Sequence, residues 1–64
     1  MDLSLWKGKR EVKIVLKEVN EQGNNMIFSN CIILDASSDS ISFFDKFGKM
    51  KMYSSDEIKE VKEE

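Results

Sequence analysis

The chain has 64 residues, a formal net charge of −2, one cysteine and no histidine. Its length limits it to one domain, and a chain this short buries only about 60% of its unfolded surface. The single cysteine excludes an internal disulfide, and a tetrahedral zinc site cannot be completed without histidine or a second thiol. Since very small domains without such supports commonly rely on partner subunits, we expect a homo-oligomer and no cofactor.

Three features of the sequence indicate the cellular compartment. No apolar run approaches the ~20 residues that a membrane helix needs, and no basic-then-apolar leader begins the sequence. The free thiol of Cys31 is typical of a reducing compartment. We therefore expect a cytoplasmic protein that makes no membrane contact.

The amino-terminal half predicts a short turn and two strands. In residues 1–11, Asp2 and Ser4 are both suited to cap one helical turn, which Gly8 would end. Alternating apolar residues from Val12 to Val19 predict a half-buried strand. The polar residues 21–25 predict a turn, and residues 26–34 predict a longer strand that is apolar on both faces. Such a strand bends between two layers or meets a partner subunit.

The carboxy-terminal half predicts three more strands. Residues 35–40 read as a turn, 41–45 and 49–53 as a hairpin, and 58–61 as a short closing strand. The capping-box spacing of Ser54 and Glu57 offers a helix from Ser55 onward as an alternative. Only two apolar residues follow, so a turn and a strand are favoured. The predicted fold is all-β: a single small, five-stranded, strongly bent antiparallel β-barrel over residues 1–64, with a short N-terminal helical turn and an acidic tail at 62–64.

The composition offers no constellation for catalysis. Without histidine there is no imidazole base to activate a serine or cysteine. Cys31 reads as a small buried hydrophobe. Asp35 and Asp39 lie in a serine-rich turn, where carboxylates cap backbone amides. The chain is therefore expected not to be an enzyme.

Two features indicate binding surfaces. Phe43 and Phe44 are adjacent in a predicted strand, so their side chains point to opposite faces and one lies outside the core, where a subunit interface would cover it. Trp6 lies beside Lys7, Lys9 and Arg10. An aromatic ring among cations stacks a base while the cations hold phosphates, or it plugs an open barrel end while the cations stay solvated. Both interpretations remain open.

The order of these elements resembles the Sm-like superfamily, and within it the bacterial Hfq branch, over residues 12–61. The matching segments are 10–16 for the first strand, 32–35 for the end of the second, 41–44 for the third, and Tyr53 with Ile58 and Val61 around the turn into the fifth. The resemblance implies a hexameric or heptameric homo-oligomeric ring. In such rings strand four of one subunit pairs with strand five of the next, and family members bind single-stranded RNA.

The resemblance also sets the predicted site residues. Those for RNA are Tyr53, Trp6, Lys7, Lys9, Arg10, Ser38 and Asp39, and those for the subunit interface are Phe44, Met50, Met52, Ile58 and Val61. The chain departs from the Hfq pattern after Tyr53, where Ser54 and Ser55 replace lysine and histidine. The alternative function is therefore a protein–protein interaction or assembly module that binds no nucleic acid.

Overall fold

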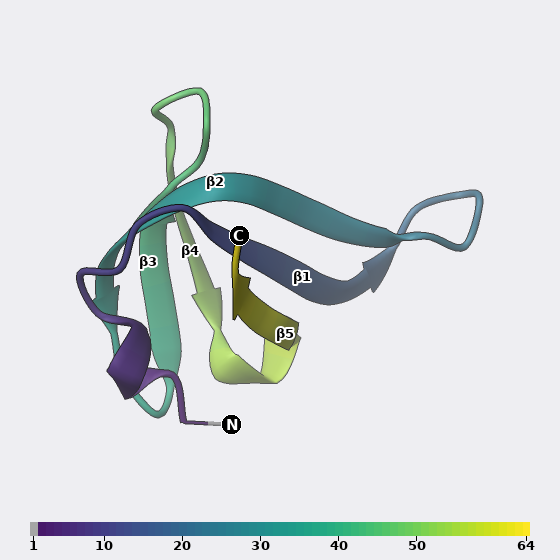
Figure 1. Cartoon of the computed structure of the whole chain (residues 1–64). Coiled ribbons are helices and arrows are strands. Elements are labelled where there is room, and N and C mark those ends of the chain that lie inside the picture. Colours follow the sequence, from purple (N-terminus) through teal and green to yellow (C-terminus); the bar gives the residue numbers. More distant parts are fainter. Residues whose placement is uncertain (1) are drawn as a thin grey trace.

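The protein is described here by a computed structural model that covers residues 2–64. Within them, five antiparallel strands form one sheet with the order β4-β3-β2-β1-β5. The elements in chain order are η1 (Ser4–Trp6), β1 (Val12–Val19), β2 (Asn25–Ala36), β3 (Ser40–Phe44), β4 (Met50–Ser54), η2 (Ser55–Glu57) and β5 (Ile58–Glu63), where η marks a single 3₁₀ turn (Figure 1). This confirms the predicted all-β class, the N-terminal helical turn, and a strand rather than a helix after residue 57.

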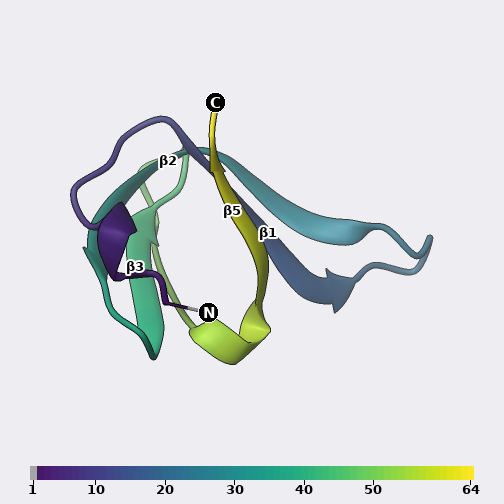
Figure 2. The ribbon, with the colours of Figure 1, turned by 60° about the horizontal axis from the view of Figure 1, so that its bottom comes forward.

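Strand β2 joins the two halves of the sheet. Its first part pairs with β1 and its last part pairs with β3, so one long strand serves two walls of the fold. Figure 2 shows β3 with the last part of β2 on one side of the interior, and β5 and β1 on the other. The strand is apolar on both faces, as the sequence predicted, but within residues 2–64 its inner residues Cys31 and Ile33 are buried while Ile32 and Leu34 on the outer face are exposed.

A bulge at Asn30 changes which residues of β2 face inward. Between the pairs Val12–Cys31 and Ile14–Phe28 the register shifts by one residue, and Asn30 takes a positive φ of 53°. Asn tolerates this left-handed conformation better than most residues, and an extra residue reverses the alternation of a strand. Phe28 therefore packs against the core on the side of Cys31 and Ile33, whereas unbroken alternation along residues 26–34 would have placed it on the outer face with Ile32.

The core is built from alternating residues of four strands and one residue of the N-terminal segment. Its members are Leu3, Val12, Ile14, Leu16, Cys31, Ile33, Ala36, Ile41, Phe43 and Ile58. On β1 the buried residues alternate with Lys13 and Val15, as a half-buried strand requires. Strand β4 supplies none of the fully buried residues.

The N-terminal segment covers β2 where β1 leaves it. The Gly8 amide donates to the Ile33 carbonyl at 3.1 Å, and the Ile33 amide donates to the Lys9 carbonyl at 2.8 Å. These bonds hold η1 against β2 and place the fully buried Leu3 in the core. The interior is therefore closed at this end by Leu3, with Trp6 packed beside it.

The five strands form a strongly bent but open sheet, so the predicted closed barrel is not observed in this single chain. Strands β4 and β5 stand at the two ends of the strand order, and no pairing joins them within residues 2–64. Strand β5 is longer than predicted: it runs to Glu63, and the Glu64 amide donates to the Glu11 carbonyl at 3.0 Å. The expected acidic tail is thus mostly part of the sheet. None of the helical turns in this part of the chain has the length and apolar character to cross a membrane.

Candidate assembly surface

Strand β4 is the least covered element of the sheet. Among residues 2–64 it pairs with β3 along one edge only, and none of its residues is buried. Met50 and Met52 point away from the core and are 60% and 66% exposed. An uncovered edge strand with exposed apolar side chains is a template for pairing with another chain, and soluble proteins usually protect such an edge.

The outer face beside β4 is apolar as well. The register places Ile32 opposite Phe44 and Phe44 opposite Met50, so these three side chains form a row across β2, β3 and β4. Leu34 and Met52 extend this surface, and both are exposed. We name the five residues the outer apolar face: Ile32, Leu34, Phe44, Met50 and Met52.

Phe43 and Phe44 divide between the two sides of the sheet, as the sequence predicted. Phe43 is fully buried and makes an edge-on contact with the Phe28 ring, with centroids 5.4 Å apart. Phe44 is half-buried on the opposite face. Its place outside the core is therefore established, whereas its role at an interface stays a prediction.

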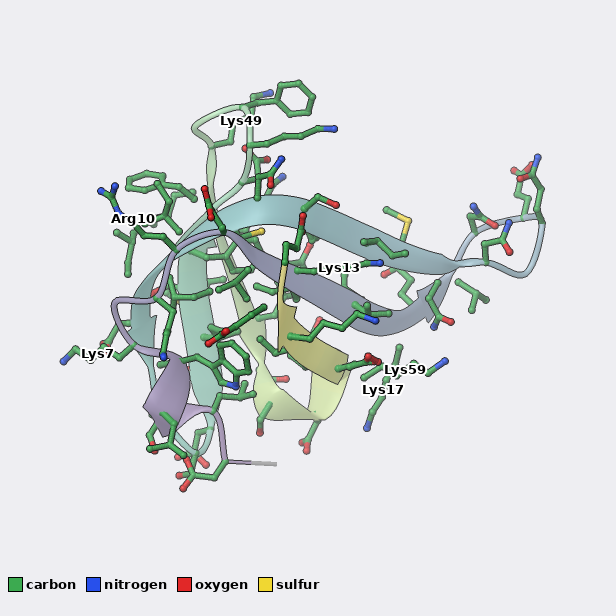
Figure 3. The ribbon with its side chains drawn as sticks, in the orientation of Figure 1. Lys7, Arg10, Lys13, Lys17, Lys49 and Lys59 are labelled. Atoms are coloured by element: carbon green, nitrogen blue, oxygen red, sulfur yellow. The ribbon has the colours of Figure 1, made fainter. Side chains whose placement is uncertain are left out.

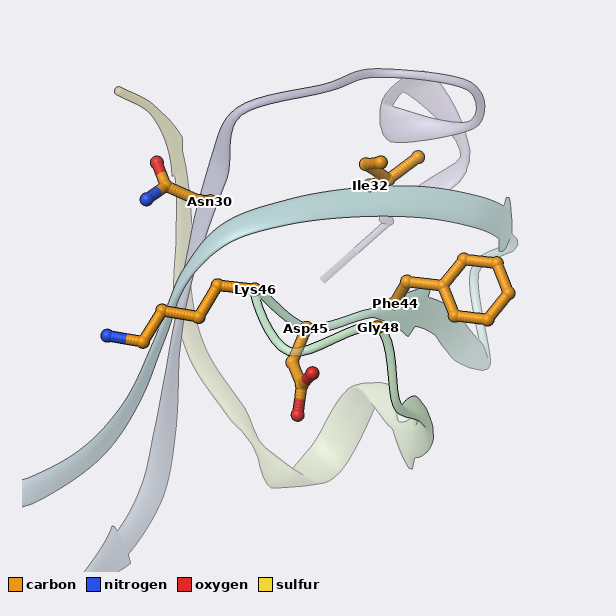
Figure 4. Close-up of a pocket in the computed structure, with 6 residues that line it drawn as sticks. All are labelled: Asn30, Ile32, Phe44, Asp45, Lys46 and Gly48. Atoms are coloured by element: carbon orange, nitrogen blue, oxygen red, sulfur yellow. The ribbon is translucent and has the colours of Figure 1, made fainter.

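A shallow groove of about 490 Å³ lies at one end of the outer apolar face. Ile32 and Phe44 form apolar parts of its lining, and Asn30, Asp45, Lys46 and Gly48 complete it (Figure 4). The Asp45 carboxylate is engaged inside its own turn, where it accepts the amides of Lys49 at 3.0 Å and Phe47 at 2.9 Å. These bonds, that from Lys49 foremost, lower the pKa of Asp45. The Asp45 charge is therefore held within its own turn, and the Lys46 ammonium lies over the Phe47 ring, 5.3 Å from its centroid.

The two interface residues predicted on β5 lie differently. Ile58 is 1% exposed and belongs to the core of this chain, so its side chain is not presented to a neighbour. The Ile58 side chain is thus occupied by the core of this chain, and its role at an interface stays a prediction. Val61 is half-buried and packs against the core. Strand β5 can still offer its backbone edge, which is unpaired on the side away from β1 within the described residues.

Tyr53, the residue predicted to stack RNA bases, is engaged by aromatic neighbours. Its ring lies over Phe43 with an interplanar angle of 20° and centroids 6.1 Å apart, and the Phe28 centroid is 5.9 Å away. Burial raises the pKa of the Tyr53 hydroxyl, with the nearby Glu18 and Glu57 adding to the effect. One face of the ring is therefore occupied by the chain's own core.

Trp6 and Tyr53 do not come together as one stacking platform. Trp6 packs from η1 against the core, and Tyr53 reaches the core from β4. The aromatic partners of Tyr53 within residues 2–64 are Phe28 and Phe43. These positions favour the second interpretation of Trp6, a ring that helps close the end of the fold.

Two of the predicted phosphate-binding cations have acidic partners. Lys7 lies 3.6 Å from the Asp35 carboxylate, and Lys9 lies 3.5 Å from that of Glu63. The side chains are at least half exposed, so these pairs are weak. They nevertheless place negative charge where RNA phosphates were expected. Arg10 is exposed in the segment that leads into β1.

Ser38 and Asp39, the remaining residues predicted for RNA, lie in the turn between β2 and β3. The Asp39 amide donates to the Ser37 hydroxyl at 3.2 Å. The Asp39 carbonyl receives the Ser55 amide at 2.7 Å, which links this turn to η2. The backbone hydrogen bonds of Asp39 therefore stabilise this turn and its contact with η2.

Metal and thiol chemistry have little support among residues 2–64. No three carboxylate or thiol side chains of this part of the chain converge on one point. Cys31 is fully buried, and this burial raises the pKa of its thiol to about 11. A thiol with such a pKa is protonated at neutral pH and is a poor nucleophile.

Sequence reasoning missed Ile32 and Leu34 as surface residues because it did not place the bulge at Asn30. The other three residues of the outer apolar face, Phe44, Met50 and Met52, could be predicted from the alternation of side chains along the strands. The comparisons with known proteins add no assignment: the chain matches no protein-family model, no curated protein and no solved structure.

Proposed function

We propose that the protein is an assembly module that pairs with copies of itself through the open edges of its sheet, in a ring of the Sm-like kind. The proposal rests on strand β4, whose outer edge is unpaired in the part of the chain that the structure describes. Its Met50 and Met52 side chains are exposed, and none of its residues is buried. A second copy would cover this edge and would bury the methionines.

The other free edge supplies the matching surface. Strand β5 ends the sheet on the opposite side from β4, so contact between them is head to tail rather than symmetric. Head-to-tail contacts generate a ring when the rotation between copies closes, and a filament when it does not. The resemblance to Sm-like proteins favours a hexamer or heptamer.

The native mass by light scattering tests this function. The wild-type protein is expected as a ring-sized particle, and the Met50→Gln/Met52→Gln variant as smaller species. Leu5→Gln is the matched control, because Leu5 is 85% exposed on η1, away from β4. A wild-type protein that stays monomeric at all concentrations contradicts the proposal, as does an equal loss of mass in the control.

Binding of single-stranded RNA remains a separate prediction of the family resemblance. The contacts of Tyr53, Trp6, Lys7 and Lys9 favour packing and local ion pairs over an RNA pocket. Assembly is therefore the function that the geometry supports better.

A further inference from the structure

The pairing of β1 with β5 places two lysines directly opposite each other. Lys13 on β1 is the register partner of Lys62 on β5. Like charges at opposite positions of an antiparallel pair repel and weaken the sheet. This pair does not stabilise the sheet, and an anion bound between the two ammonium groups would relieve their repulsion.

Two more lysines lie on the same outer side. Lys17 follows the buried Leu16 on β1, and Lys59 follows the buried Ile58 on β5. Because successive side chains of a strand alternate between its faces, Lys17 points away from the core. Lys59 is exposed at the register shift between the pairs Val15–Glu60 and Leu16–Ile58. Figure 3 shows Lys13, Lys17 and Lys59 beside β1 and β5, whereas Lys7, Arg10 and Lys49 lie elsewhere. We name this surface the lysine face: Lys13, Lys17, Lys59 and Lys62.

The positive charge of the lysine face is poorly compensated. Within residues 2–64 its one ion pair joins Lys62 to Glu60, two residues away on the same strand, at 3.4 Å. The Lys59 ammonium donates to the neutral Asn25 side chain at 3.2 Å. The face thus holds four of the chain's ten cations, although the whole chain is acidic.

We propose that the lysine face binds the phosphodiester backbone of a nucleic acid. Alternate residues of a strand repeat every ~7 Å and neighbouring strands lie ~4.8 Å apart, so the cations form a small array that suits a repeating polyanion. Lysines bind phosphates as point charges and carry no sequence information. This surface is distinct from the one predicted around Tyr53 and Trp6, and it does not require assembly.

The side chains around the four lysines favour a nucleic acid over an anionic membrane as the ligand. Val15, half-buried, is the apolar residue between Lys13 and Lys17, and Ile27 is its register partner. No tryptophan, tyrosine or phenylalanine belongs to the lysine face, whereas membrane-surface elements typically combine their cations with large apolar and aromatic side chains. Contact with phosphates alone also predicts binding without base preference.

Fluorescence anisotropy with labelled oligonucleotides tests the proposal. Single-stranded RNA, single-stranded DNA and duplex DNA of one length are each titrated with the full chain at ~20 mM salt and then at rising salt. Each phosphate contact to a single strand contributes a slope of about −0.7 in log affinity against log salt. Lys13→Gln/Lys62→Gln is therefore expected to weaken binding at least ~10-fold at low salt and to flatten the slope by up to ~1.4.

The control is Lys46→Gln/Lys49→Gln, which removes the same charge from the exposed turn between β3 and β4. It should leave affinity and slope close to those of the wild type. The proposal is overturned by no binding at low salt, by equal losses in both variants, or by lysine-dependent binding to anionic vesicles without binding to oligonucleotides. Since light scattering measures assembly separately, failure of this proposal and failure of the ring are distinguishable.

Discussion

The Asn30 amide donates to the Glu64 carboxylate at 3.1 Å, which ties the bulge of β2 to the residue that follows β5. Asn30 has its positive φ at this point, and the change of pairing partner along β2 occurs directly after it. One backbone conformation therefore sets both the bend of the sheet and the position of the chain's carboxyl end.

Substitutions at Asn30 should follow the backbone conformation. Asn30→Gly is expected to leave the free energy of unfolding nearly unchanged, because glycine adopts a positive φ without steric cost. Asn30→Ala should lower it by about 1 kcal/mol, since a Cβ disfavours the left-handed region. Urea denaturation measures both. Equal stabilities of the two variants would show that the bulge does not depend on this conformation.

The Cys31 thiol should make stability fall at alkaline pH. Its pKa is raised to about 11 by burial, from 9.0 for the unperturbed group, so the thiol ionises in the unfolded state first. Below pH ~8 the thiol is protonated in both states, and its effect on the free energy of unfolding does not change with pH. As the pH rises from 9 toward 11 the free energy of unfolding falls, and the loss at pH 10 is about 1.4 kcal/mol.

Cys31→Ala isolates this effect from other groups that titrate in the same range. The variant is less stable at pH 7 because a small cavity replaces the sulfur. The stability difference between wild type and variant should narrow from pH 7 to pH 10, as measured by urea denaturation at each pH. A constant difference would mean that the thiol ionises equally in the folded and unfolded states.

Tyr53 distinguishes a packing role from a binding role. Tyr53→Phe keeps the ring on Phe28 and Phe43, so the free energy of unfolding should change by less than ~0.5 kcal/mol. Tyr53→Ala removes both contacts and should cost about 2 kcal/mol, less than a fully buried aromatic residue. Thermal unfolding measures stability and anisotropy measures RNA binding. An alanine variant of normal stability that loses RNA affinity would favour the binding role.

Local patterns predicted the strands well because most of them follow one alternation. Val12, Ile14 and Leu16 are buried as their period of two requires, and the capping-box spacing of Ser54 and Glu57 marks a real turn, where Glu57 accepts the Ser54 amide at 3.1 Å. The faces of β2 were not predictable in this way. An asparagine gives only a weak signal for a bulge, and a single extra residue transfers Ile32 from one face to the other.

The lysine face was hidden from the sequence for a different reason. Lys59 and Lys62 are separated from Lys13 by more than forty positions and lie in a segment rich in acidic residues. The antiparallel register of β1 and β5 brings these cations together. Charge patterns within one segment therefore gave no indication of this surface.

Lys13→Glu should stabilise the fold while it removes binding. The new carboxylate would stand opposite Lys62 and would replace repulsion with attraction, worth roughly 0.5 kcal/mol at low salt. The gain should shrink toward zero at ~1 M salt, where the Debye length is about 3 Å. Lys46→Glu is the control, because Lys46 lies in the exposed turn between β3 and β4, outside the lysine face. A gain of equal size in the control, or one that salt leaves unchanged, would contradict repulsion between Lys13 and Lys62.

Leu3 and Leu5 provide a matched pair for the role of the N-terminal segment. They are two residues apart, yet Leu3 is fully buried against the sheet and Leu5 is 85% exposed. Leu3→Ala should lower the free energy of unfolding by about 3 kcal/mol, as for leucine in an established core, whereas Leu5→Ala should change it by less than ~0.5 kcal/mol. Urea denaturation of the two variants measures the difference. If both changes are small, the segment before β1 is not part of the cooperative core, and the hydrogen bonds between Lys9 and Ile33 do not hold it there in solution.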